Sequence, residues 1–94
     1  MAGPQPTDNE EDWRAIFGHW PADLPRQGIL TTSLDSFGFS DFLLSRGILL
    51  VERDRPDAVG ARKVMLAYRS ILALKLTDPG PISRYQSLGF GSAN

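Results

Sequence analysis

The sequence predicts a mostly β protein with one N-terminal helix, whose five strands form a small, strongly bent antiparallel barrel. Three observations lead to this fold class. Short apolar segments with strand periodicity recur between turn-forming residues from 27 to 77. An apolar stripe of helical spacing precedes them. The last two strands are separated by Tyr68-Arg69-Ser70, which lacks the Gly or Asn of a two-residue hairpin, so we expect a single helical turn there.

The composition is that of one small domain held together by packing. The chain has 94 residues and no cysteine, so it has room for a single thin core and forms no disulfide or thiolate metal site. The net charge is −1; four acidic residues within the first twelve carry −4, which leaves +3 on residues 13 to 94. Neither a secretory signal nor an apolar run of transmembrane length is present. We therefore expect a soluble, cytoplasmic protein.

The first element is expected to be a helix that follows a disordered segment, residues 1 to 6. Thr7 or Asp8 can cap this helix, and Glu10 or Glu11 can complete a capping box. One apolar stripe runs along it at the spacing i, i+3, i+4 and i+7, formed by Trp13, Ile16, Phe17 and Trp20. We expect this stripe to cover an open end or a face of the sheet.

Three strands are expected next. Residues 27 to 34 alternate in polarity, as a half-buried strand does. A turn at residues 35 to 38 leads to a strand at 39 to 45, and a bulge could reverse the face that each of its residues presents. Residues 48 to 51 are apolar on both faces. Such a run is typical of a strand covered on one side by the interior and on the other by a helix or a neighbouring subunit.

Two further strands complete a domain that spans residues 7 to 78. A charged, solvated loop at 52 to 63 leads into strands at 64 to 68 and 71 to 77. Pro79, Gly80 and Pro81 then end the last strand. We expect residues 79 to 94 to form a loose tail, with docking through Tyr85, Leu88 and Phe90 as the alternative.

The order of the expected elements resembles that of the Sm-like family of small β-barrels over residues 9 to 78. It consists of one helix and then five strands, with a tight non-hairpin turn before the last strand. Aligned on that pattern, Ser45-Arg46-Gly47 occupies the place of the family's first RNA-contacting loop. RNA-binding members usually carry Asp and Asn in that loop and Arg-Gly in the second, where this chain has Ala67-Tyr68 followed by Arg69. Three segments, Trp20 to Arg26, Leu49 to Arg53 and Gly60 to Arg62, also resemble those of uncharacterised bacterial proteins, a likeness that implies no function.

The resemblance implies a homo-oligomeric ring in which the fourth strand of one subunit pairs with the fifth strand of the next. Pairing of this kind would cover strand edges that otherwise template aggregation. The resemblance also implies binding of single-stranded RNA, in which Tyr68 stacks on a base while Arg46 and Arg69 hold phosphates or base edges. The implied subunit interface comprises Val64, Met65, Leu66, Ile71, Leu72, Ala73 and Leu74.

Few residues suit catalysis or metal binding. His19 is the only histidine, and a packed or solvated imidazole explains it more simply than a base or a metal ligand. Asp35 and Asp41 could approach each other across a hairpin but lack a partner nucleophile. We therefore expect a non-enzymatic protein without metal, small-molecule cofactor or membrane contact. It is either an RNA-binding ring or a protein-interaction barrel that binds no nucleic acid.

Overall fold

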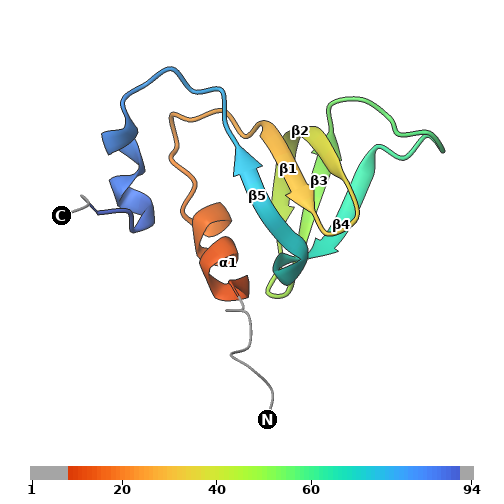
Figure 1. Cartoon of the computed structure of the whole chain (residues 1–94), viewed down its shortest axis with the longest axis horizontal. Coiled ribbons are helices and arrows are strands. Elements are labelled where there is room, and N and C mark those ends of the chain that lie inside the picture. The colour runs from red at the N-terminus through yellow and green to blue at the C-terminus, as the bar shows by residue number, and fades with distance from the viewer. Residues whose placement is uncertain (1–8, 92–94) are drawn as a thin grey trace, which may run out of the picture.

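The computed structural model describes residues 9 to 91 and contains an N-terminal helix followed by a five-stranded antiparallel sheet (Figure 1). The elements are α1 (Glu10–Gly18), β1 (Gly28–Thr32), β2 (Ser36–Leu44), β3 (Ile48–Arg53), β4 (Lys63–Ala67), the 3-10 turn η1 (Tyr68–Ser70), β5 (Ile71–Lys75) and the 3-10 helix η2 (Ile82–Leu88). The strands lie in the order β4-β3-β2-β1-β5. One helix before five antiparallel strands is the predicted arrangement. The sheet is bent but not closed, because β4 and β5 do not pair within the described residues.

A single 3-10 turn, η1, joins β4 to β5 as the sequence predicts. The residues on either side of it, Ala67 and Ile71, are both extended, so the two strands run directly into the turn. Ser70 Oγ donates a hydrogen bond of 2.7 Å to the Ala67 carbonyl and braces it. The turn therefore carries the chain away from β4, and β5 pairs with β1 instead.

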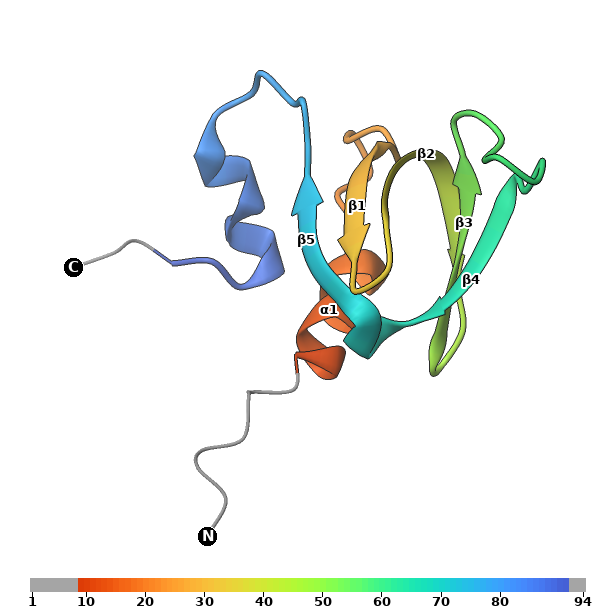
Figure 2. The ribbon, with the colours of Figure 1, turned by 45° about the vertical axis from the view of Figure 1, so that its right-hand side comes forward.

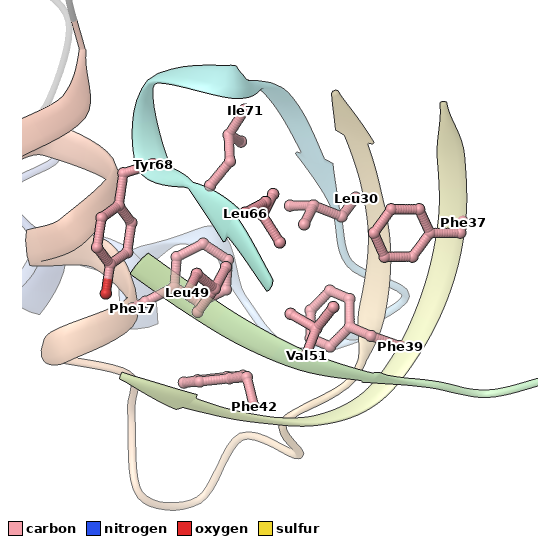
Figure 3. Packing of buried hydrophobic residues seen from close by; sticks show 10 residues of the cluster. All are labelled: Phe17, Leu30, Phe37, Phe39, Phe42, Leu49, Val51, Leu66, Tyr68 and Ile71. Atoms are coloured by element: carbon pink, nitrogen blue, oxygen red, sulfur yellow. The ribbon is translucent and has the colours of Figure 1, made fainter. Parts of the chain in front are cut away.

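The core lies between α1 and the inner face of the sheet (Figure 3). Its buried residues are Phe17, Leu30, Phe37, Phe39, Phe42, Leu49, Val51, Leu66, Tyr68 and Ile71, with Trp13 and Trp20 packed against them. The Phe17 ring stacks on Trp20 at 5.5 Å between centroids and meets Phe42 edge to face at 5.0 Å. Trp20 Nε1 donates to the Leu24 carbonyl at 3.0 Å, which satisfies its one polar atom. The aromatic stripe thus covers the sheet as predicted.

A bulge in β2 places both Phe39 and Phe42 in the core. The register of β2 against β3 shifts between Phe39 and Asp41, and the extra residue brings two side chains three positions apart onto one face. The turn predicted at residues 35 to 38 is wrong, because β2 already begins at Ser36. The chain turns before it, where Thr32 Oγ1 accepts hydrogen bonds from the backbone N–H groups of residues 34 and 35, each at 3.2 Å.

The secondary structure at the two ends of the described chain differs from the prediction. Residues 82 to 88, expected within a loose tail, form η2, and Gly89 ends it at φ 100, a conformation that favours glycine. At the other end α1 begins at Glu10, after an Asn9 that makes no side-chain capping bond. Thr7, Asp8 and the segment predicted to be disordered lie outside the described residues. No helix between residues 9 and 91 is long and apolar enough to span a membrane.

Candidate functional site

The two free edges of the sheet belong to β4 and β5 (Figure 2). Each strand has five residues, contains no proline and is mostly apolar. On one side β4 pairs with β3 and β5 pairs with β1, which leaves the backbone groups of their other sides without ladder partners among residues 9 to 91. Unpaired apolar edges of this kind are ready templates for pairing with another strand.

The residues predicted to form a subunit interface divide by exposure. Leu66 and Ile71 are buried in the core, so their side chains already serve the monomer. Met65 and Leu72 are 74% and 65% exposed and are free to contact a partner. The half-buried members are Val64, Ala73 and Leu74. A partner strand would therefore meet mainly backbone groups and two exposed apolar side chains.

The residues predicted to bind RNA lie at one end of the sheet, where η1 meets the turn between β2 and β3. The Tyr68 hydroxyl donates to the Ser45 carbonyl at 2.9 Å, and Arg14 Nη1 donates to the Arg46 carbonyl at 2.8 Å. These bonds join α1, the 45–47 turn and η1. Arg46 and Arg69 are exposed and form no ion pair within the described residues. The structure therefore brings both predicted arginines to the same end and adds Arg14, which sequence reasoning missed.

The prediction that Tyr68 stacks on a base does not fit its position. Its side chain is completely buried in the core cluster, so neither face of the ring is open to a nucleobase. Burial also raises the pKa of the Tyr68 phenol above its usual value, which keeps the hydroxyl protonated as a donor to Ser45. Tyr68 thus anchors η1 to the 45–47 turn.

Acidic side chains lie at this same end of the molecule. The first turn of α1 carries Glu10, Glu11 and Asp12, and this turn lies close to η1 in both views (Figures 1 and 2). Glu11 Oε1 is 3.7 Å from Arg14 Nη2. The charge here is mixed, whereas the phosphate backbone of a nucleic acid favours a clear excess of positive charge.

An apolar groove of about 730 Å³ lies between η2 on one side and α1 with the end of β5 on the other. Trp13 and Ile16 of α1 line it, together with Leu74 of β5 and with Leu76, which follows that strand. Across from them are Ile82, Tyr85, Leu88 and Phe90. The spacing of three in Ile82, Tyr85 and Leu88 matches the period of a 3-10 helix, whose residues i and i+3 lie on one face. That spacing is the one sequence signal that could have revealed this surface.

The residues considered for catalysis have separate structural roles. His19 Nδ1 lies 2.9 Å from the Ala15 carbonyl at the end of α1. Asp35 pairs with Arg53 at 3.8 Å, while Asp41 pairs with Arg26 at 4.0 Å. No group of three or more potential metal ligands gathers anywhere between residues 9 and 91.

Comparison with known proteins identifies no relative. No protein-family model, curated protein or solved structure matches this chain.

Proposed function

We propose that this protein is a non-enzymatic assembly module of Sm-like topology, in which β4 of one subunit pairs with β5 of the next to build a closed homo-oligomer. The observation that supports the proposal is the presence of two different free strand edges on one bent sheet. In such an assembly the sheets of successive subunits join and the bent sheet becomes part of a continuous β structure.

Pairing β4 with β5 would be a head-to-tail contact. Each subunit offers one edge of each kind, so every contact uses up one β4 and one β5 and leaves another pair open until the ring closes. A two-fold contact of β4 with β4 would leave both β5 edges free. Closure is thus the arrangement that satisfies every edge.

Two lysine substitutions test the head-to-tail contact. Met65→Lys places a charge on the β4 edge and Leu72→Lys places one on the β5 edge; because both side chains are largely exposed, the monomer should tolerate them. We expect each variant alone to be monomeric by native mass spectrometry, since every possible contact contains one blocked edge. An equimolar mixture should give dimers and nothing larger, because one intact β4 and one intact β5 remain.

Leu43→Lys is the matched control. Leu43 is 63% exposed and lies in register with Leu50, which is itself paired with Met65, so Leu43 and Met65 share the outer face. However, β2 is an internal strand and offers no edge. Leu43→Lys should assemble like the unmodified chain. If it disrupts assembly as strongly as Met65→Lys, or if Leu72→Lys alone has no effect, the head-to-tail arrangement is wrong.

Single-stranded RNA is a second candidate ligand, supported by the convergence of Arg14, Arg46 and Arg69 at one end of the subunit. In a ring this end would repeat and raise the effective concentration of a weak contact. Arg46→Ala combined with Arg69→Ala should weaken binding of a labelled single-stranded oligonucleotide. It should also reduce the slope of log K against log salt concentration by about 1.4, which corresponds to two lost phosphate contacts.

The control for this experiment is Arg55→Ala combined with Arg62→Ala, two exposed arginines in the loop between β3 and β4. This change removes the same charge elsewhere and should leave most of the binding intact. Equal loss in both double variants would mean nonspecific attraction. Absence of binding by the unmodified chain would leave a protein-interaction module that binds no nucleic acid.

A further inference from the structure

The helix η2 lies beside the free edge of β5. On its other edge β5 pairs with β1, and both views place η2 on the side of β5 that faces away from β1 (Figures 1 and 2). Leu74 of β5 and Leu76 form one wall of the apolar groove, and η2 forms the opposite wall. A strand that adds to this edge therefore approaches through the space that η2 borders.

A second copy of this chain would bring more than one strand to that edge. Its β4 is paired with β3 along the whole strand, from Lys63 opposite Glu52 to Ala67 opposite Ile48. The sheet continues beyond β3 with β2, and each further strand lies about 4.8 Å farther out. When β4 of a second copy pairs with β5, its β3 and β2 extend into the region where η2 stands. A neighbouring subunit and η2 thus compete for the same side of β5.

Polar bonds hold η2 in this position without a packed interface, since none of its residues is buried. Arg84 donates to Asp23 Oδ2 at 2.6 Å and to Asp78 Oδ1 at 2.7 Å, and the Tyr85 hydroxyl donates to Asp78 Oδ2 at 2.7 Å. Residues 76 to 81, which join η2 to β5, form neither helix nor strand. Rotation within this connection can move η2 once the three bonds open.

We propose that η2 is a displaceable strap that opposes assembly of its own subunit. It obstructs the β5 edge while it is bound to Asp23 and Asp78, and β4 of a second copy pairs with β5 only after η2 moves away. The inference rests on the proposed function and adds a regulatory step to it. Covering a strand edge with a helix is one way in which proteins prevent uncontrolled strand pairing. Because only the released form can pair, the apparent association constant is the intrinsic constant multiplied by the released fraction.

Two substitutions test the strap by weakening the bonds of η2 without changing either strand edge. Arg84→Gln removes the ion pairs with Asp23 and Asp78, and Asp78→Asn replaces the charged acceptor with a neutral amide. Each should lower the concentration of half-assembly about three- to tenfold in sedimentation equilibrium of the full chain, because a charge-assisted hydrogen bond is lost from the closed form alone.

Asp57→Asn is the matched control. Its carboxylate accepts hydrogen bonds from the backbone N–H groups of Val59 and Ala61 in the loop between β3 and β4, so the same chemical change is made away from η2. Asp57→Asn should assemble like the unmodified chain.

Amide hydrogen exchange gives a second readout, recorded on the unmodified chain before and after assembly. Residues 71 to 75 should exchange more slowly in the assembly, because the free edge of β5 gains a partner strand. Residues 82 to 88 should exchange faster, because a 3-10 helix of seven residues is not stable once it has lost its contacts. Slower exchange of η2 on assembly would overturn the strap.

The outcomes separate the strap from the edge pairing on which it rests. If the unmodified chain and both η2 variants are monomeric, or if Met65→Lys leaves assembly intact, the proposed function fails and the strap fails with it. If Met65→Lys dissociates the assembly while Arg84→Gln and Asp78→Asn match Asp57→Asn, edge pairing stands and the strap is overturned. A gain in association that persists when Met65→Lys is added to Asp78→Asn would also overturn it, because that gain would come from another surface.

Discussion

Tyr68 holds three segments together through one ring and one hydroxyl group. Its ring fills the core beneath α1, and its hydroxyl reaches the Ser45 carbonyl in the 45–47 turn. Because η1 follows directly from β4, this anchor also fixes where the chain leaves one edge strand for the other. The same residue cannot serve as a stacking platform for RNA while it does so.

Substitutions at Tyr68 should separate the contribution of the ring from that of the hydroxyl. Tyr68→Phe removes one part-buried hydrogen bond, to the Ser45 carbonyl, and should lower the free energy of unfolding by about 0.5–1.5 kcal/mol. Tyr68→Ala should lower it by about 3–5 kcal/mol, the usual range for loss of a buried aromatic ring. Urea unfolding followed by circular dichroism measures both. Equal stability of the Ala variant and the unmodified chain would contradict the buried position.

At the scale of elements, the sequence shows which segments are strands better than it shows their ends. The β4–η1–β5 connection was predictable because Tyr68-Arg69-Ser70 lacks the residues of a hairpin turn. The start of β2 was missed because Asp35, Ser36 and Gly38 are residues typical of turns; the bulge farther along the strand brings Phe42 into the core beside Phe37 and Phe39. The spacing of Ile82, Tyr85 and Leu88 indicates a 3-10 helix, but no local pattern could reveal where η2 lies, since its position depends on Arg84 reaching Asp23, which is 61 residues away in the chain.

The hydrogen bonds that join Arg84 and Tyr85 of η2 to Asp78, and Arg84 to Asp23, form a polar brace that should make the position of η2 depend on pH. Hydrogen bonds from Tyr85 and Arg84 lower the pKa of the Asp78 carboxyl below its ordinary value near 3.8. Because this pKa is lower in the folded than in the unfolded state, the brace contributes fully to the stability of the folded position of η2 above about pH 4. This contribution is lost as the pH falls through the lowered folded value. Amide hydrogen exchange of residues 82 to 88, recorded from pH 6 to pH 2, should show this loss.

Asp78→Asn provides the comparison for that titration. It should leave η2 less protected at pH 6 and remove most of the pH dependence, because an amide cannot form the charged pair with Arg84. Asp57→Asn is a control in the β3–β4 loop, where backbone N–H groups also lower the carboxyl pKa. Exchange of η2 should be the same in Asp57→Asn and in the unmodified chain. A pH response of η2 that persists in Asp78→Asn would assign it to another group.

At the scale of the whole molecule, a single subunit can bury only a limited part of its apolar surface. A chain of 94 residues can bury only about 60–65% of the surface that it exposes when unfolded. Two apolar edges and an apolar groove remain open in the single subunit. Association would therefore remove from water the apolar edges and groove that a single subunit leaves exposed.

Assembly should make thermal stability depend on protein concentration. If subunits dissociate before or during unfolding, mass action raises the melting temperature as the concentration rises. Calorimetry of the unmodified chain over a hundredfold range of concentration should show this increase. Met65→Lys should melt at one temperature throughout the range. Identical, concentration-independent melting of both proteins would argue for a monomer.

The η1 turn also has a consequence for the time course of folding. Neighbouring strands from β1 to β4 pair in succession along the chain, but the second side of β1 waits for β5, since Ile29 pairs with Lys75. Contacts between such distant residues form late, because a long loop must close before they contribute. A nascent chain leaving the ribosome therefore exposes β1 as a free edge until nearly all of the sheet has been synthesised. Chaperone dependence of this protein should be greatest in that interval.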